Sequence, residues 1–311
     1  MSDLLSGTIW QTANNASIQG DLSARHYQRL TASNGDTAIL MDASQQAESV
    51  EPFLRITAWL HKNGISVPEV MLSNPNKLLL EDFGDLKLSS LTGAERKSGY
   101  ALCIDLLLTI RRCDSPELFR PDPNELAGWI DVARNYPGAK AIEIDELSPF
   151  LETEFEKILP WFSSVSLRDF HADNIMWLEN RSGIRRLGLL DYQDAFLTHP
   201  VYDLVSLLTD ARTHISREFR NTLIDQYVEK SDDDPIELQK AFALFSAQRN
   251  LRILGIFARA AQTGKTHHVS KMPRVYQYYV EALEHPVFDP IRDTATAALP
   301  FPDDALLRSL Q

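Results

Sequence analysis

Three polar residues, Asp169, Asn174 and Asp191, stand next to short apolar segments in the middle of the 311-residue chain. Asp169 and Asn174 lie five positions apart on a predicted loop, and Asp191 follows the second of two predicted strands. Phosphoryl transfer needs a carboxylate that holds or deprotonates the attacking hydroxyl, and oxygen ligands that fix Mg2+ on the nucleotide phosphates. This spacing therefore predicts a catalytic base at Asp169 and a magnesium site formed by Asn174 and Asp191.

A strand-rich stretch between residues 164 and 191 must position these three residues. A short strand and a loop come first, and a hairpin follows, with strands at Ile175–Leu178 and Arg186–Leu190 and a turn at Asn180–Gly183. Because the two strands of a hairpin lie side by side, the residue before the first strand and the residue after the second lie at the same end. We therefore expect the base and both metal ligands to reach one pocket.

The rest of the chain divides into a strand-rich part and a helical part. The first 85 residues predict strands, among them Ala38–Met41 and Lys77–Phe83, around one helix at Val50–Leu60. From residue 86 onward helices predominate, with predicted starts at Thr92, Ser148-Pro149 and Asp234-Pro235. The pattern predicts an α+β fold in which a strand-rich part precedes a larger helical part.

The catalytic spacing also carries a family resemblance. Arg168-Asp169, four residues, Asn174, an apolar hairpin and then Asp191 resemble the catalytic loop of protein kinases and, more closely, the aminoglycoside phosphotransferase and choline kinase group. The resemblance implies a protein-kinase-like bilobal fold: a nucleotide-binding lobe over residues 1–85, a hinge at about 80–86, and a helical lobe over residues 86–311 with the catalytic hairpin and the acceptor site. It also implies an ATP-dependent, Mg2+-requiring enzyme that phosphorylates a hydroxyl of a small molecule.

Two positions depart from this family. Leu167 stands where the family usually has histidine, so the hydrogen bond by which that histidine braces the loop must be absent or replaced. Kinases also pair the nucleotide phosphates with a lysine on a strand of the small lobe, yet no lysine precedes Lys62. The phosphate charge must then be met elsewhere. Arg25 and Arg29 are the first candidates, and the alternative for each is an ordinary surface cation.

The segment Lys77–Gly84 corresponds in this resemblance to the kinase hinge. The backbone from Glu81 to Phe83 would hydrogen-bond the edge of the adenine ring, while Leu79 would pack against the ring.

One branch of the group is similar to this chain nearly from end to end. It comprises the cytoplasmic anomeric kinases of cell-wall recycling, which phosphorylate N-acetylmuramate and N-acetylglucosamine at C1. The matching segments include Gly20–Arg29, Ile39–Ala43, Pro52–Arg55, Leu80–Asp85, Leu190–Ala195, His199–Leu207 and Gln248–Gly255. The branch shares the missing strand lysine.

The segment around residue 250 offers groups suited to an acidic amino sugar. Arg249 and Arg252 lie three positions apart on a predicted helix, next to Asn250, and would attract a carboxylate and repel a cationic antibiotic. The alternative is that these arginines pair with acidic side chains elsewhere. Asp194 is a further candidate for substrate binding, or a brace for its own loop. Trp161 and Trp177 could stack on a sugar ring, but core packing is the favoured interpretation for both.

The composition excludes several other classes of function. Lys and Arg number 31 against 43 Asp and Glu, so the net charge is −12 and no nucleic-acid partner is expected. Cys103 and Cys113 form neither a zinc motif nor a disulfide framework. No targeting segment or membrane span is predicted, and we expect a cytoplasmic protein that acts on a small-molecule sugar or amino alcohol. The oligomeric state stays open.

The sequence leaves two alternative functions open. Within the same class, the acceptor could be an aminoglycoside or another amino alcohol. From a different class, the missing lysine and Leu167 suit a catalytically silent, nucleotide-binding module with a kinase-like fold. The joint presence of Asp169, Asn174 and Asp191 argues against a silent module, which would not need all three together.

Overall fold

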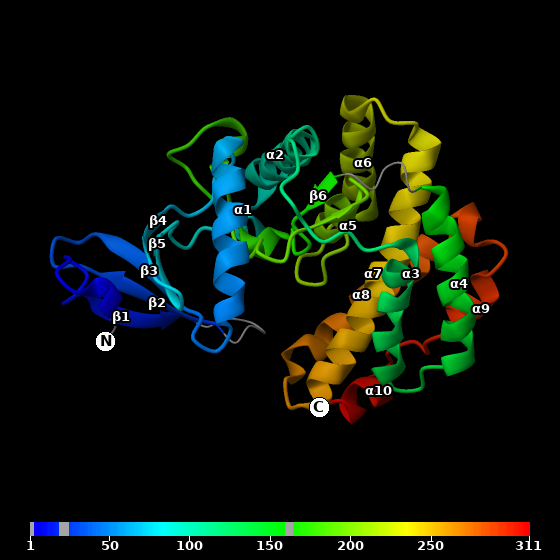
Figure 1. The fold of residues 1–311 in the computed structure, drawn as a ribbon. Helices are drawn as coiled ribbons and strands as arrows, with labels where there is room; N and C mark the ends of the chain where they lie inside the picture. Colours follow the sequence, from blue (N-terminus) through cyan, green and yellow to red (C-terminus); the bar gives the residue numbers. More distant parts are fainter. Residues whose placement is uncertain (1–2, 19–24, 159–163) are drawn as a thin grey trace. The chain divides into compact units, whose positions relative to one another are not determined.

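A five-stranded antiparallel sheet is formed by the N-terminal part of the chain (Figure 1). Its strands are β1 (Asn14–Ile18), β2 (His26–Thr31), β3 (Thr37–Asp42), β4 (Val70–Ser73) and β5 (Lys77–Glu81), in the order β1-β2-β3-β5-β4. The strands predicted at 38–41 and 77–83 are thus confirmed as β3 and β5, and they pair with each other.

The computed structural model describes residues 3–18, 25–158 and 164–311, which divide by their contacts into two units. Unit 1 contains Met1–Cys103 and Asp173–Asp194, and unit 2 contains Ile104–Ala172 and Ala195–Gln311. The chain passes from one unit to the other within helix α2 (Gly93–Arg111) and again on each side of the predicted hairpin. The lobe boundary predicted at residues 85 and 86 stays a prediction.

The two faces of the sheet differ. On one face a buried hydrophobic cluster contains Leu5, Trp10, Leu30, Ala32, Ala38, Leu40 and Leu79. Tyr27 and Arg29 of β2 pair with Met41 and Ile39 of β3. Because side chains alternate along a strand and paired residues share a face, these four residues lie on the opposite face from the cluster.

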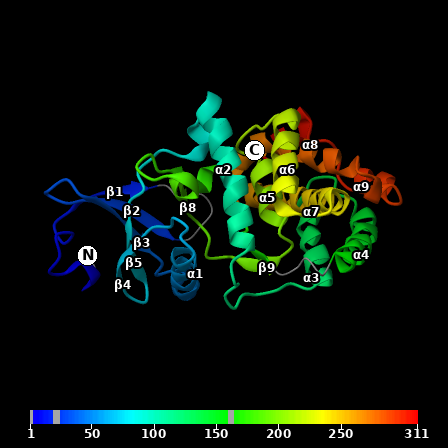
Figure 2. The same ribbon diagram turned by 90° about the horizontal axis from the view of Figure 1, so that it is seen from above.

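Helix α1 (Val50–Lys62) lies beside the sheet in both views (Figures 1 and 2). It buries Phe53, Ile56 and Leu60, which recur at the spacing of one helical face. Gly64 ends it with a φ of 73°, a left-handed conformation that glycine adopts without steric cost. The helix predicted at 50–60 is therefore confirmed.

The predicted hairpin is present and belongs to unit 1. After the short helix η6 (Ala172–Asn174) come β7 (Ile175–Trp177), a 3-10 turn η7 (Gly183–Arg186) and β8 (Leu187–Leu189). Two backbone hydrogen bonds fix the hairpin to the rest of the unit: Leu189 N–H donates to Ser66 O at 2.8 Å, and Trp177 N–H donates to Leu86 O at 2.7 Å.

Unit 2 is mainly helical, and its longest helix, α7 (Pro235–Gln262), runs through its centre (Figure 2). The other helices are α3 (Pro123–Gly128), η4 (Trp129–Asn135), α4 (Ala141–Lys157), α5 (Tyr202–Leu208), α6 (Arg217–Ser231), η8 (Thr266–Lys271), α8 (Met272–Leu283), η9 (Pro286–Phe288), α9 (Arg292–Ala297) and α10 (Asp304–Ser309). Two short strands, β6 (Ser164–Ser166) and β9 (Phe196–Thr198), pair with each other.

The predicted start of α7 is confirmed. The Asp234 side chain accepts hydrogen bonds from the N–H groups of Ile236 and Glu237, and Pro235 fills the first helical position.

The helix start predicted at Ser148-Pro149 is wrong, because α4 begins at Ala141 and Pro149 lies inside it. The buried residues Ile144, Leu147 and Leu151 continue one apolar face across the proline. Packing of that face offsets the hydrogen bond that proline cannot donate.

No helix within the described ranges is both long enough and apolar enough to cross a lipid bilayer.

Candidate active site

Asp169 lies on the loop that follows β6, in unit 2. Its side chain is 47% exposed, so a substrate hydroxyl can reach the carboxylate. The residue before it, Arg168, has a φ of 70°, a left-handed conformation that is costly for a non-glycine residue. Such a conformation persists only where neighbouring contacts fix the backbone.

Asp203 on α5 supplies those contacts. Its carboxylate accepts hydrogen bonds from Leu167 N–H at 2.6 Å, from Ser166 Oγ at 2.7 Å and from Arg168 N–H at 3.1 Å. Burial raises the pKa of Asp203 to about 6, although these three hydrogen bonds act in the opposite direction. The bracing bond lost with Leu167 is thus replaced by a carboxylate that binds the backbone.

The residues alone did not assign this role to Asp203. One feature of the sequence could have indicated it: Asp203 is the only charged residue in Tyr202–Leu208. The structure shows that every residue of this helix is buried. A carboxylate in such a setting needs hydrogen-bond donors close by.

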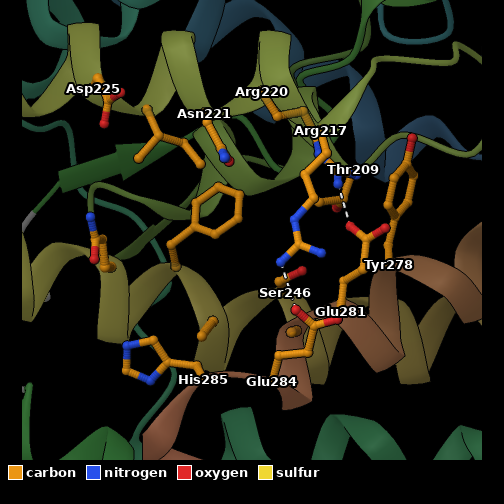
Figure 3. A pocket seen from close by; sticks show the side chains of 15 residues that line it. Thr209, Arg217, Arg220, Asn221, Asp225, Ser246, Tyr278, Glu281, Glu284 and His285 are labelled. Carbon is orange, nitrogen blue, oxygen red and sulfur yellow. Dashed lines mark hydrogen bonds and ion pairs between the residues drawn. The ribbon is translucent and has the colours of Figure 1, made fainter.

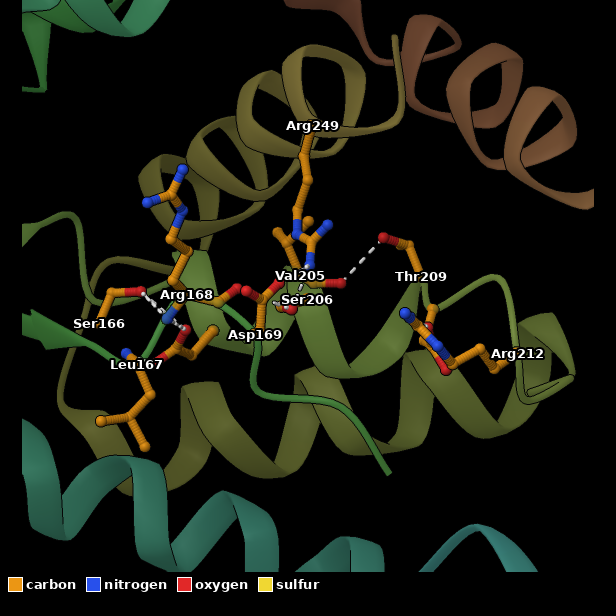
Figure 4. Close-up of polar contacts among 11 residues, drawn as sticks. Ser166, Leu167, Arg168, Asp169, Val205, Ser206, Thr209, Arg212 and Arg249 are labelled. Atoms are coloured by element: carbon orange, nitrogen blue, oxygen red, sulfur yellow. Dashed lines mark hydrogen bonds and ion pairs between the residues drawn. The ribbon is translucent and has the colours of Figure 1, made fainter. Parts of the chain in front are cut away.

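Arg249 reaches from α7 to the catalytic loop (Figure 4). Its Nη2 donates to Ser206 Oγ at 2.6 Å and lies 4.0 Å from Asp169 Oδ1. Ser206 Oγ in turn donates to the carbonyl oxygen of Arg168 at 3.3 Å. The structure therefore brings Arg249 and Asp169 together and links both to the brace from α5.

Asn250 and Arg252, the other predicted substrate residues on α7, have different contacts from Arg249. Asn250 is fully buried, and its Nδ2 contacts Ser246 and Thr209 within unit 2. The guanidinium of Arg252 lies over the ring of Trp129, 5.0 Å from the ring centre. A substrate contact by either residue stays a prediction.

Asn174 and Asp191 are neighbours in unit 1. Leu190 N–H donates to Asn174 O at 2.9 Å, next to the β7–β8 pairing, so Asn174 and Asp191 lie at the same end of the hairpin. Asp191 has a φ of 57°, and its Oδ1 accepts a hydrogen bond from Gln193 Nε2 at 3.0 Å. Gln193 Nε2 also donates to Asp194 Oδ2 at 3.0 Å.

An amide oxygen and a carboxylate are hard oxygen donors, and the Asp191 side chain is 45% exposed, so this end of the hairpin suits Mg2+. Asp169 belongs to unit 2 and these two ligands belong to unit 1, and their convergence in one pocket stays a prediction. Within the described residues, no cluster of three or more His, Cys, Asp and Glu side chains offers another metal site.

Arg25 and Arg29, the two predicted phosphate contacts, have different partners. Arg25 is buried, and its Nη2 lies 3.4 Å from Asp191 Oδ1. Arg29 is held by the segment after β5: its Nε lies 2.7 Å from Asp82, its Nη2 lies 2.9 Å from Asp85, and it also donates to Gly84 O. Hydrogen bonds to Asp85 and Asp82 raise the pKa of Arg29. Residues 20–24 of the matching segment Gly20–Arg29 lie outside the described residues.

The predicted adenine contacts lie at the end of β5. Leu79 packs in the hydrophobic cluster, on the opposite sheet face from Arg29. Glu81 N–H donates to Glu69 O at 2.8 Å, and its carboxylate pairs with Arg181 at 2.6 Å. Arg181 also lies over the Phe83 ring at 5.1 Å. Nucleotide binding by Leu79, Glu81 and Phe83 stays a prediction.

Neither tryptophan adds to the site. Trp177 is buried in unit 1, where the guanidinium of Arg186 lies 4.8 Å from its ring centre, so the packing interpretation holds. Trp161 lies outside the described residues.

A cavity of about 470 Å³ opens between α6, α7 and α8 in unit 2 (Figure 3). Its cations are already neutralised, because Arg217 pairs with Glu284 at 2.6 Å and Arg220 pairs with Glu281. None of the predicted site residues lines it.

The model of the phosphotransferase enzyme family matches residues 16–238, more than half of the chain.

Curated relatives share more of the chain. An N-acetylmuramate/N-acetylglucosamine kinase from Caulobacter vibrioides is 29% identical, and the match covers 84% of this chain and 85% of the relative. One from Neisseria meningitidis serogroup B is 28% identical, with 83% and 82% covered.

Among solved structures, the choline kinase LicA from Streptococcus pneumoniae has a similar fold. The TM-score is 0.62 at 13% identity, and the match covers 87% of this chain and 95% of the kinase. The predicted protein-kinase-like fold and the predicted family resemblance are therefore confirmed.

Proposed function

The chain belongs to the phosphotransferase enzyme family, and from this premise we propose that it transfers the γ-phosphoryl group of ATP to the anomeric hydroxyl of N-acetylmuramate or N-acetylglucosamine. The broader activity, that of a small-molecule kinase, follows from the family itself.

One observation carries the choice of acceptor. Four curated relatives, at 24% to 29% identity, bear the same name, N-acetylmuramate/N-acetylglucosamine kinase. Each match covers at least 83% of this chain and at least 82% of the relative. The match thus extends beyond the catalytic loop to the helices that would bind an acceptor.

Asp169 is the catalytic base of this proposal. The anomeric oxygen attacks the γ-phosphorus, the new O–P bond forms as the bond to the bridging β–γ oxygen breaks, and ADP leaves. The hydroxyl proton passes to the Asp169 carboxylate. Arg249, whose Nη2 lies 4.0 Å from Asp169 Oδ1, would orient that carboxylate.

Asn174 and Asp191 would hold Mg2+ in this scheme. Bound there, the metal would neutralise charge on the β- and γ-phosphates. Arg25, whose Nη2 lies 3.4 Å from Asp191 Oδ1, would take over the task of the missing strand lysine. Arg29 is less well placed for it, because Asp82 and Asp85 already neutralise its charge.

Phosphorus NMR of the product tests the proposal. Purified protein is incubated with ATP, Mg2+ and a panel of amino sugars, aminoglycosides and amino alcohols. We expect an anomeric sugar phosphate, whose phosphorus couples to the C1 proton. Phosphate on another hydroxyl, or on an aminoglycoside, would refute the choice of acceptor and leave the kinase class standing. Nucleotide binding without turnover of any acceptor would instead favour the silent module.

A further inference from the structure

We infer that the guanidinium groups of Arg168 and Arg252, both of which lie against the ring of Trp129, form a subsite for a carboxylate on the acceptor. The enzyme would therefore favour N-acetylmuramate over N-acetylglucosamine. The inference rests on the proposed function and names which of the two sugars the site selects.

Three separate elements of unit 2 build this subsite. The guanidinium carbon of Arg252, on α7, lies 5.0 Å from the centre of the Trp129 ring, and that of Arg168, on the catalytic loop, lies 5.8 Å from it. Phe196 fixes Trp129 by an edge-to-face contact at 5.5 Å. Stacking on one ring keeps both cations in place without using their N–H groups.

The charge of these two arginines is not neutralised by the protein. Across the part of the chain that the structure describes, neither Arg168 nor Arg252 forms an ion pair with a carboxylate, whereas Arg29, Arg111 and Arg134 each do. This is notable in a chain with 43 acidic and 31 basic residues.

Burial lowers the pKa of Arg252, and the neighbouring Arg168 and Arg249 lower it further, against an opposing effect from Tyr202. Positive charge is therefore concentrated at one place. A bound anion would relieve this repulsion and form charge-assisted hydrogen bonds.

The subsite lies beside the predicted base. Arg168 directly precedes Asp169 in the chain, and Asp169 is among the charges that act on Arg252. Arg249 is less suited to the carboxylate than Arg252, because its Nη2 donates to Ser206 and lies 4.0 Å from Asp169 Oδ1. A carboxylate at Arg252 would thus belong to a molecule whose hydroxyl is close to Asp169.

The two candidate sugars differ in this respect. N-acetylmuramate carries a lactyl ether that ends in a carboxylate, and N-acetylglucosamine has a neutral hydroxyl at the same carbon. A charge-assisted hydrogen bond contributes enough to change an affinity by roughly 10- to 100-fold. Only the acidic sugar can gain this contribution.

The test measures kcat/KM for both sugars in the wild type and in Arg252→Gln. We expect the variant to lose about 10- to 100-fold with N-acetylmuramate and less than about threefold with N-acetylglucosamine. Arg252 is chosen because Arg168 has a left-handed backbone next to the base. The matched control is Arg259→Gln, which removes an exposed cation seven positions further along α7. It should leave kcat/KM unchanged for both sugars.

Several outcomes would overturn the inference. An equal loss for both sugars would make Arg252 a structural residue, and no loss for either sugar would remove the subsite. If Arg252→Gln does not fold, Arg252→Met gives the same comparison, because methionine keeps a flexible unbranched side chain and removes the charge. A wild type that phosphorylates neither sugar would refute the proposed function as well, so the two failures are distinguishable.

Discussion

The carboxylate of Asp203 accepts a hydrogen bond of 2.6 Å from the backbone N–H of Leu167, 36 positions earlier in the chain. Leu167 occupies the position where the family usually has a bracing histidine, and an apolar side chain cannot serve that purpose. The brace therefore acts on the backbone, where the identity of the side chain is irrelevant. It fixes the residue directly before Arg168, whose φ of 70° needs such support.

Asp203→Asn should weaken this brace. The amide presents one oxygen and one N–H2 group, so at least one of the three donors at Leu167, Ser166 and Arg168 loses its acceptor. We expect kcat to fall by roughly 100-fold, and the free energy of unfolding to fall by about 1–3 kcal/mol. Steady-state kinetics and urea denaturation measure the two effects.

The control for this change is Asp225→Asn, which alters an exposed carboxylate of the same unit. It should change neither quantity. If Asp203→Asn keeps full activity, the loop does not depend on the brace.

Asp169→Asn should abolish most of the activity and leave the fold intact. The amide keeps the shape of the side chain but cannot take up the hydroxyl proton, and general-base catalysis contributes roughly 10²- to 10⁴-fold. Because the side chain is 47% exposed, the melting temperature should hardly move. Steady-state kinetics measure the activity, and calorimetry measures the melting temperature. Asp293→Asn, at an exposed site, serves as control. Activity within tenfold of the wild type would assign the base elsewhere.

Arg25→Gln and Arg29→Gln should have different effects. Arg25 lies 3.4 Å from Asp191, so its loss should raise the KM for ATP by about tenfold or lower kcat by as much. Arg29 holds Asp82 and Asp85, so its loss should mainly lower stability, by about 1–2 kcal/mol. ATP titrations and denaturation of both variants measure this. The opposite assignment of effects would make Arg29 the phosphate contact.

The ion pair between Asp42 and Lys77 should make the stability of the protein depend on pH. Although burial acts in the opposite direction, hydrogen bonds from Lys77 and Ser44 lower the pKa of Asp42 from 3.8 to about 2. A lowered pKa in the folded state stabilises the protein above pH 4, and that contribution is lost as the pH falls from about 4 to about 2. The pair is partly exposed, so the contribution is at most about 1 kcal/mol.

Urea denaturation of the wild type and of Asp42→Asn, from pH 2 to neutral pH, measures the contribution of the Asp42 carboxylate to the free energy of unfolding. The difference in the free energy of unfolding should be largest near neutral pH and vanish near pH 2. Glu48→Gln, at an exposed site, serves as control. A difference that does not change with pH would show that the carboxylate charge is not involved.

Local signals explain which features the sequence predicts well. Helix α7 begins at a cap followed by proline, and α1 ends at Asn63-Gly64, so short stretches of chain determine these ends. The hairpin that carries Asn174 and Asp191 is likewise a local structure, with its turn between two apolar runs.

Features that depend on distant partners escaped prediction. Asp203 becomes a brace only because the chain brings α5 to the loop after β6. The sequence does not distinguish the three leucines at positions 78–80. Only strand pairing places Leu79 in the buried hydrophobic cluster, on the opposite sheet face from Arg29. Arg29 is as plausible a phosphate contact as Arg25 until Asp82 and Asp85 are seen beside it.

Gly255 allows the closest approach between α7 and η4, the helices that carry Arg252 and Trp129. A Cβ atom at this position would lie 2.2 Å from Val132 O and 2.5 Å from the Cα of Ala133. Both are backbone atoms, which cannot move aside as a flexible side chain would. Gly255→Ala should therefore cost about 1–3 kcal/mol or more, despite the higher helix propensity of alanine.

Calorimetry measures this against Gly128→Ala, where φ is −61° and a Cβ meets no atom within 4 Å. That control should be neutral, or stabilising by up to about 1 kcal/mol. Because the clash separates Arg252 from Trp129, the preference for N-acetylmuramate should fall in Gly255→Ala and persist in Gly128→Ala. If both variants are equally stable, α7 and η4 do not approach this closely.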